Sequence, residues 1–175
     1  MKYELTDETI DVSGTTLHRI KALKDFGNVK KGELGGYVES EYNLSQIGNC
    51  WVYGNARVCG DAELCGNAKV YGNAEVCGNA KVYGNAWVYG NAELCGNARV
   101  YGNADYITIK GLGSRYRDTT IFKTRNEDVV VRCGCFYGTL TEFVNEVGIT
   151  HGDSKYAKEY LALVELAKIH FGIEK

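Results

Sequence analysis

The chain has 175 residues and a net charge of −2, with 20 basic and 22 acidic residues spread along it. This length suits one ordinary domain, or a short repeat array with a cap at each end, and leaves little room for a separate catalytic domain. The even mixture of charges disfavours a nucleic-acid partner and an anionic membrane, because both are normally held by clustered basic residues.

The chain begins MKYELTDETI, which has neither the basic nor the apolar region of a signal peptide, and no apolar run is long enough to span a membrane. We therefore expect a cytoplasmic protein with no membrane partner. Its seven cysteines would stay reduced there. Their spacing matches neither a disulfide framework nor paired zinc knuckles, so we expect no metal and no cofactor.

Residues 1–45 are predicted to form an N-terminal β cap. Short strands are expected at residues 2–6, 9–12 and 17–23. The glycine-rich stretch GELGGYVES follows and enters the register of the next region at Leu34 and Val38.

Residues 46–106 contain ten consecutive hexads, from QIGNCW to VYGNAD. The first position is Val or Leu in nine of them, the third is always Gly, and the fifth is Ala except once. The aliphatic residue and its neighbours alternate as in a short strand, and Gly-Asn supplies a corner, because Gly reaches positive φ and Asn tolerates the left-handed region. Since one large and one small inward residue per side are too few for a sandwich core, the chain must coil.

These hexads resemble the hexapeptide-repeat family. The resemblance implies a left-handed parallel β-helix, a triangular prism with 18 residues in each coil. Residues 18 apart then stack in columns on the outer faces. The first face has Trp51 with Tyr53, Lys69 with Tyr71, Trp87 with Tyr89, and Asp105 with Ile107. The second has Arg57, Glu75 and Glu93 with Cys59, Cys77 and Cys95; the third has Glu63, Lys81 and Arg99 with Cys65, Tyr83 and Tyr101.

The first face is an aromatic column that has three interpretations. It is buried against another subunit or under a cap, it stacks on a planar ligand such as a nucleobase with Lys69 beside an anionic group, or it only stabilises neighbouring coils. The column of Cys59, Cys77 and Cys95 is interpreted as packing, because parallel thiols at strand spacing fit neither a tetrahedral metal site nor a disulfide.

Residues 107–175 are predicted to form a C-terminal cap of strands and two helices. Strands are expected at residues 105–112, 118–124 and 128–135. The turn GLGSRYRD brings Arg115 and Arg117 together, which suits recognition of phosphate or carboxylate; a solvated charged turn explains the same residues. Cys133 and Cys135 should point to opposite faces of a strand, and His151 could approach either of them as a thiolate-imidazole pair.

The first helix should begin with a capping box at Thr139 and Glu142, and the second near Asp153. An apolar stripe on the second helix is expected to pack on the strands or on the end of the coil. Its members are Tyr160, Leu161, Val164, Ala167 and Phe171.

Acyltransferases with the hexapeptide-repeat fold use a histidine as general base, whereas residues 46–105 contain none. His18, His151 and His170 all lie in the flanks. The resemblance to that fold therefore does not carry the catalytic residue over, and we identify no catalytic residue.

Nearly the whole chain resembles a group of bacterial and phage β-helix proteins that are labelled as transferases because of their fold. The motifs that carry this resemblance are LHRIKALKDFG, GELGGYVESEYNLSQIGNCWVYGNA, CGCFYGTLTEF and THGDSKYAKEYLALVELAKIHF. It implies a bacterial or phage setting and a homo-oligomer, with a trimer favoured.

Our preferred interpretation is a non-enzymatic protein that binds a small anionic, nucleotide-like ligand or a host defence protein. An acyl- or nucleotidyl-transferase is the second interpretation, and a structural scaffold is the third. The candidate ligand-binding residues are Trp51, Tyr53, Lys69, Tyr71, Trp87, Tyr89, Arg115 and Arg117.

Overall fold

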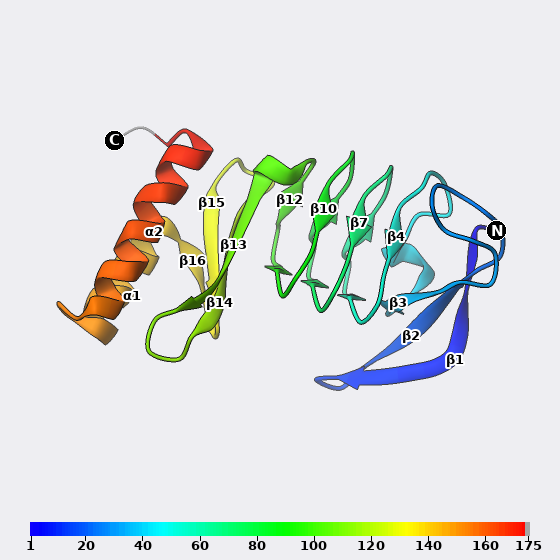
Figure 1. Cartoon of the computed structure of the whole chain (residues 1–175), viewed down its shortest axis with the longest axis horizontal. Helices are drawn as coiled ribbons and strands as arrows, with labels where there is room; N and C mark the ends of the chain where they lie inside the picture. The colour runs from blue at the N-terminus through cyan, green and yellow to red at the C-terminus, as the bar shows by residue number, and fades with distance from the viewer. Residues whose placement is uncertain (174–175) are drawn as a thin grey trace. The chain divides into compact units, whose positions relative to one another are not determined.

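The computed structural model describes residues 1–173 of the chain and separates into two compact units, Met1–Asn103 and Ala104–Lys175. The first unit contains the repeats, and the second contains both α-helices (Figure 1). The fold is mainly β, as predicted. None of the helices within residues 1–173 is long and apolar enough to cross a membrane.

The first unit opens with an antiparallel hairpin of β1 (Tyr3–Val12) and β2 (Thr15–Ala22). The register shifts between Leu5 and Thr9, so the two separate strands predicted in this stretch are one strand with an irregularity. β3 (Leu34–Val38) pairs antiparallel with β2 and parallel with β5, and thereby joins the hairpin to the repeats. A short 3-10 helix, η1 (Glu41–Asn43), follows.

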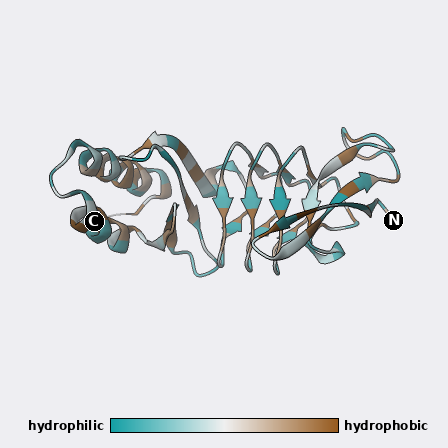
Figure 2. Ribbon diagram, turned by 90° about the horizontal axis from the view of Figure 1, so that it is seen from below, coloured by the Kyte–Doolittle hydropathy of each residue, from teal (hydrophilic) through white to brown (hydrophobic). Residues whose placement is uncertain are grey.

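A two-residue strand lies at each junction between successive hexads, and strands of successive coils pair in parallel, which confirms a parallel β-solenoid (Figure 2). The strands are β4 (Trp51–Val52), β5 (Arg57–Val58), β6 (Glu63–Leu64), β7 (Lys69–Val70), β8 (Glu75–Val76), β9 (Lys81–Val82), β10 (Trp87–Val88), β11 (Glu93–Leu94) and β12 (Arg99–Val100). Partners such as Trp51 and Lys69 are 18 residues apart, as predicted. In the entering coil the partners Val38 and Val58 are 20 apart, because two extra residues precede β4. The left-handed sense implied by the resemblance stays a prediction.

The corners of the coil depend on glycine, small inward residues and an asparagine ladder. The repeat glycines have positive φ, for example +67° at Gly78, and the repeat alanines are buried. The repeat asparagines do not adopt positive φ, contrary to the expectation that they would share the left-handed corner. Instead, the Asn49 amide donates to Asn67 Oδ1 at 3.2 Å and the Asn67 amide donates to Asn85 Oδ1 at 3.0 Å. Asparagine therefore links successive coils.

The predicted fourth position of the aromatic face, at Asp105 and Ile107, is wrong. Asp105 ends a 3-10 helix, η2 (Asn103–Asp105), and Ile107 lies in β13, which pairs antiparallel with β14 rather than with a coil. The hexad pattern stops at Ala104, so nothing dictates a further parallel rung.

The second unit is a four-stranded antiparallel sheet followed by two helices. Its elements are β13 (Tyr106–Leu112), β14 (Arg117–Lys123), β15 (Val129–Cys133), β16 (Phe136–Thr139), α1 (Leu140–His151) and α2 (Lys155–Phe171). The first three strands were predicted; β16 was missed, because its four residues directly precede the helix.

α1 begins with the predicted capping box. Thr139 Oγ1 accepts from the Glu142 backbone N–H at 3.2 Å, and Glu142 Oε2 accepts from the Thr139 N–H at 2.7 Å. α2 is capped by Ser154, which accepts from the Ala157 N–H at 3.4 Å, so the prediction of Asp153 as the cap is off by one residue.

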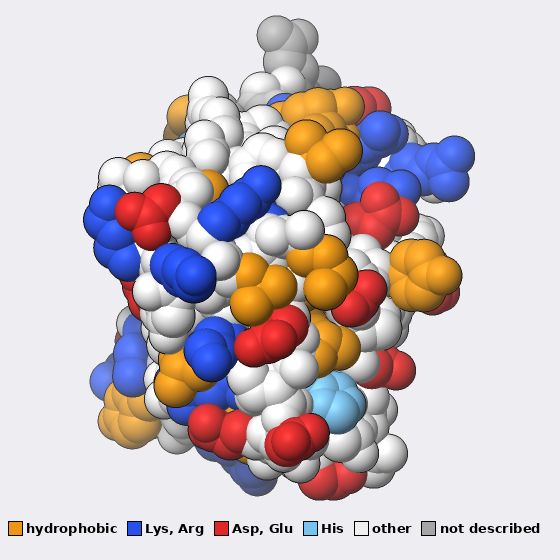
Figure 3. Space-filling model, turned by 90° about the vertical axis from the view of Figure 1, so that its right-hand side faces the viewer, with side chains coloured by type: hydrophobic (Ala, Val, Ile, Leu, Met, Phe, Trp, Pro, Cys, Tyr) orange, Lys and Arg blue, Asp and Glu red, His pale blue; other side chains and the backbone are white. Residues whose placement is uncertain are grey.

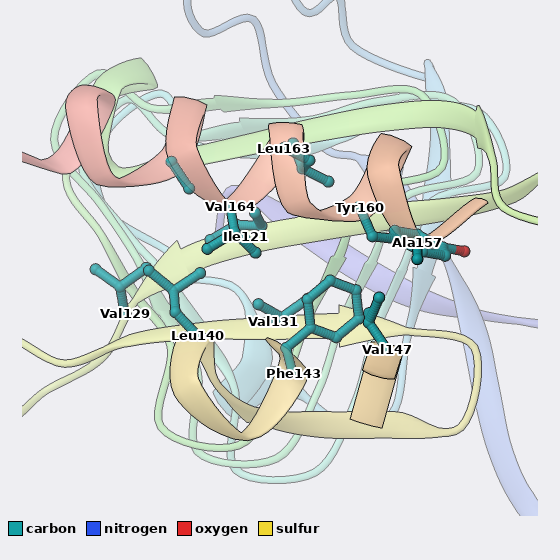
Figure 4. Packing of buried hydrophobic residues seen from close by; sticks show 11 residues of the cluster. Ile121, Val129, Val131, Leu140, Phe143, Val147, Ala157, Tyr160, Leu163 and Val164 are labelled. Atoms are coloured by element: carbon teal, nitrogen blue, oxygen red, sulfur yellow. The ribbon is translucent and has the colours of Figure 1, made fainter. Parts of the chain in front are cut away.

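One apolar core lies between the helices and the sheet of this unit (Figure 4). Phe143, Tyr160 and Val164 meet Ile121 and Val131 there. Leu161, which we placed on the buried stripe of α2, is 40% exposed, and Leu163 is buried instead. A position three residues after Tyr160 stays on the same helix face, whereas the adjacent position turns by about 100°.

Candidate functional site

The predicted aromatic column forms, but it is not one exposed surface. Trp51 pairs in register with Lys69, and Lys69 with Trp87, so these side chains lie on one face of the coil. Trp51 is nevertheless fully buried. Its ring makes edge contacts with Phe26 at 5.3 Å and Tyr3 at 6.1 Å between ring centroids.

Trp51 is therefore a core residue, and its assignment to a ligand-binding surface is corrected. The N-terminal segment covers it, as one of the three interpretations anticipated. A segment this far from Trp51 in the sequence could not be assigned to it from the repeat pattern alone.

The other members of the aromatic column interact mainly with one another. The rings of Tyr53 and Tyr71 stack with centroids 4.4 Å apart, and Tyr71 contacts the Trp87 ring edge-on at 6.1 Å. Lys69 Nζ lies 5.5 Å from the centroid of the Trp87 ring. Trp87 and Tyr89 are about half-exposed, at 49% and 57%. Such contacts stabilise neighbouring coils without a ligand.

The cysteine column on the second face contains reduced thiols at Cys59, Cys77 and Cys95. The neighbouring Cys77 thiol and burial raise the pKa of Cys59 above its ordinary value. A thiol with a raised pKa is a weak nucleophile. Within residues 1–173 no group of His, Cys, Asp and Glu side chains is arranged to hold a metal ion.

The second unit contains a pocket of about 330 Å³ at one end of its sheet. The start of β14, the end of β15 and the start of β16 meet there, because neighbouring strands are antiparallel. The lining residues are Ser114, Arg115, Arg117, Cys133, Cys135, Phe136, Phe143, Glu146, Val147, Thr150, His151 and Tyr160. The pocket therefore combines cationic, thiol, hydroxyl and aromatic groups, and we take it as the candidate functional site.

The two predicted arginines line this pocket. Arg117 is the first residue of β14, and Arg115 lies in the turn before it. The Arg117 side chain passes over Gly134, which has φ +60° and no side chain; a Cβ there would overlap the guanidinium and lie 3.0 Å from Cδ. Because Gly134 has no side chain, the Arg117 side chain can cross it and enter the pocket.

Both cysteines of the Cys-Gly-Cys turn line the same pocket, contrary to the expectation that they would point to opposite faces. β15 ends at Cys133, and the left-handed backbone of Gly134 reverses the chain before Cys135. Strand alternation therefore does not extend to Cys135.

Cys133 lies between two hydroxyl groups. Thr119, its pairing partner on β14, donates from Oγ1 to Cys133 Sγ at 3.3 Å. The Tyr160 hydroxyl lies 3.7 Å from the same sulfur and donates to the Leu112 carbonyl oxygen at 3.4 Å. Burial and the hydrogen bond with Cys133 raise the pKa of Tyr160, so its hydroxyl stays protonated over the whole neutral range.

The C-terminal end of α1 supplies the remaining polar groups of the pocket. The His151 ring lies with its centroid 5.6 Å from that of Tyr160. Glu146 is exposed and accepts from Thr150 Oγ1 at 3.0 Å. We predicted that His151 could approach Cys133 or Cys135, and all three side chains do line one pocket. Among the described residues, no hydrogen bond joins His151 to either cysteine.

Glu146, Thr150 and Tyr160 were not predicted to belong to this site. Tyr160 was assigned to the apolar stripe of α2, and its ring does lie in the core. A tyrosine in a helix stripe signals that a hydroxyl must find a partner at the edge of that core. Glu146 and Thr150 are four positions apart on α1, which places them on one helix face, and His151 is the next residue.

No family model matches the chain. A curated protein of Escherichia coli (strain K12), named uncharacterized acetyltransferase YdcK, is 33% identical to it over 84 residues. The similarity is to an acetyltransferase. The matched part covers 36% of this chain. The chain spans about a quarter, 26%, of the length of the Escherichia coli protein.

Proposed function

We propose that this protein binds a small anionic ligand in the pocket of its second unit. The observation that carries the proposal is the presence of Arg115 and Arg117 at a concave site, with no ion pair to either guanidinium among residues 1–173. An arginine within reach of a carboxylate would normally pair with it, so two unpaired guanidinium groups at one pocket leave donors for an incoming anion.

The walls of the pocket favour an anion that also has an apolar or planar part. Phe136, Phe143 and Tyr160 contribute ring surface, and the Phe136 and Phe143 centroids lie 5.1 Å apart. A nucleotide or a small aromatic acid would place its ring against these residues and its charged group at the arginines. Hydrogen bonds to charged groups contribute about 1.5–3 kcal/mol each, so losing one arginine should weaken binding roughly tenfold or more.

Isothermal titration of the purified protein with phosphate, nucleoside monophosphates and an aromatic carboxylate tests this proposal. The variants Arg115→Gln and Arg117→Gln should each reduce affinity for the best of these ligands. Arg125→Gln is the matched control, because Arg125 is exposed and does not line the pocket. Equal affinities in all variants would refute the proposed site.

Acetyl transfer is a second candidate function, favoured by the partial similarity to the Escherichia coli protein named an acetyltransferase. No histidine lies in the repeats, so the imidazole for such chemistry would have to come from a flank. Incubation with acetyl-CoA and a panel of amine acceptors, followed by mass spectrometry, should give an acetylated product that disappears in His151→Gln. Unchanged product formation in that variant would exclude His151 from the reaction.

We further propose that the protein is a homotrimer, as the resemblance implies. Trp87 and Tyr89 are large, half-exposed aromatic residues on one face of the coil, and contacts between protomers commonly cover such groups. Light scattering should give about three times the monomer mass of 19.3 kDa. A monomer at micromolar concentration would overturn this proposal.

A further inference from the structure

We infer that Cys133 is a nucleophilic thiol that forms a reversible covalent bond with a small anionic carbonyl compound, such as an oxo acid. This inference rests on the proposed function, because it places the anionic group of the ligand at the arginines of the same pocket. It adds the chemical class of the ligand and the atom that reacts with it.

Cys133 differs from the other cysteines in the groups that surround its sulfur. Thr119 Oγ1 donates to its sulfur at 3.3 Å, and the Tyr160 hydroxyl lies 3.7 Å away. The Arg117 guanidinium is held over Gly134, the next residue in the chain. Because the Tyr160 hydroxyl donates to the Leu112 carbonyl oxygen, Thr119 is the hydroxyl donor to the sulfur. A hydrogen-bond donor to the sulfur and a cation at the same pocket favour attack by this thiol on an electrophilic carbon.

The other cysteines lack this combination. Cys50 is buried and receives a hydrogen bond from the buried Lys2 amine at 3.2 Å. Cys65 lies on the solenoid and is exposed overall, but partial desolvation of its thiol raises the pKa of Cys65 above its ordinary value. Cys135 is exposed and lines the same pocket, yet it has no hydrogen-bond partner among the described residues. Cys65 and Cys135 are therefore internal references outside and inside the pocket.

The covalent step is an addition. A lone pair of the Cys133 sulfur forms a bond to the carbonyl carbon, and the π electrons of that carbonyl move to its oxygen. This oxygen takes up the proton that the thiol released, and the product is a thiohemiacetal. Nothing is oxidised, no group leaves, and the reverse step regenerates both partners.

The geometry of the pocket explains why the carbonyl compound should carry a negative charge. Arg117 and Cys133 approach the pocket from adjacent strands, with Gly134 between the sulfur-bearing residue and the next thiol. A carboxylate bound to a guanidinium would have its neighbouring carbon on the same side as the sulfur. A neutral aldehyde would lack this positioning and should compete poorly.

The first test compares alkylation of the full-length protein by iodoacetate, an anion, and iodoacetamide, its neutral counterpart. Peptide mass spectrometry gives the rate at each cysteine in one sample. We expect iodoacetamide to alkylate Cys133 several-fold faster than Cys65 or Cys135, because only Cys133 accepts a hydrogen bond from Thr119 beside the arginines. The ratio of the iodoacetate rate to the iodoacetamide rate should be highest at Cys133 and should fall in Arg117→Gln.

Glyoxylate, the smallest oxo acid with an aldehyde, is the second probe. It should slow alkylation of Cys133 and leave Cys65 unchanged. With carbon-13 in its aldehyde group, it should give a thiohemiacetal resonance that is absent in Cys133→Ser. Oxalate, which has the anionic groups without an aldehyde, should slow alkylation without giving that resonance.

The outcomes separate the inference from the proposed function. Equal alkylation rates at Cys133 and Cys65, together with protection by oxalate, would overturn the nucleophile and leave the anion pocket standing. Rapid alkylation of Cys133 with no preference for iodoacetate over iodoacetamide would overturn the anionic class of the ligand and, with it, the proposed anion pocket. Since Cys133→Ser retains the shape of the side chain, circular dichroism of this variant checks that the helices of the second unit still form.

Discussion

Replacement of Gly134 by alanine adds only one methyl group, yet it should lower the stability of the second unit. Gly134 has φ +60°, a conformation that costs an L-residue about 1–2 kcal/mol. Its new Cβ would also overlap the Arg117 guanidinium and lie 3.0 Å from Cδ and Cζ of that side chain. The overlapping nitrogen is the end of a flexible, partly exposed side chain, so the guanidinium can move aside, and its displacement adds at most about 1 kcal/mol. We therefore expect Gly134→Ala to lower the free energy of unfolding of the second unit by about 1–3 kcal/mol.

Gly111→Ala is the matched control for backbone strain. Gly111 has φ +90° and lies in the same sheet, but nothing lies within 4 Å of the position that its Cβ would take. Its replacement should lower the free energy of unfolding by the strain alone, about 1–2 kcal/mol. In an Arg117→Ala background, the loss caused by Gly134→Ala should fall to the same range, because the overlapping side chain is absent.

Two signals separate the unfolding of the two units. The helices α1 and α2 lie in the second unit, so far-ultraviolet circular dichroism follows that unit during urea unfolding. Trp51 and Trp87 lie in the first unit and are the protein's two tryptophans, so their fluorescence follows the repeats. Equal losses for Gly134→Ala with and without Arg117 would refute the argument that the glycine exists to admit this arginine.

Three further predictions concern the first unit. Gly78→Ala should lower its free energy of unfolding by about 1–3 kcal/mol more than Gly90→Ala, because a Cβ at Gly78 would lie 3.0 Å from backbone of the next coil and a Cβ at Gly90 meets nothing within 4 Å; equal losses in urea unfolding would contradict this. Trp51→Ala should cost about 3–5 kcal/mol and Trp87→Ala well under half of that, because only Trp51 is fully buried, and thermal unfolding compares them. Burial lowers the pKa of Lys2, so protonation of this amine favours the unfolded chain. The free energy of unfolding of the wild type, relative to that of Lys2→Met, should therefore rise as the pH increases toward 10.5, the ordinary pKa of lysine. A difference in free energy between the two proteins that does not change with pH would disprove this.

The repeat region was predictable because its information is local. Each hexad specifies one aliphatic core residue, one glycine with positive φ and one small inward residue, and the period of 18 follows from stacking three such sides. The errors lie where the pattern is interrupted. Residues 44–52 contain two more residues than the repeat needs, and after Ala104 the chain changes to an antiparallel sheet.

The candidate site was predicted only in part. Arg115 and Arg117 were identified from their charge and from the neighbouring glycines, and both line the pocket. Glu146 and Tyr160 were missed, because they come from two helices whose placement on the sheet depends on packing. Trp51 was predicted to lie on the surface but is buried, because Tyr3 and Phe26 from the N-terminal segment cover it.

The repeats by themselves determined that the chain coils, and the resemblance to the hexapeptide-repeat family implied the period of 18 and hence the order of residues along each column. Both depend on contacts between positions at fixed spacing. Only the tertiary structure decided which columns are covered and which distant side chains share a cavity. Burial of Trp51 and the meeting of Arg117, Cys133 and Tyr160 depend on how separate elements pack. Packing of this kind follows from the shapes of whole surfaces, which no short motif records.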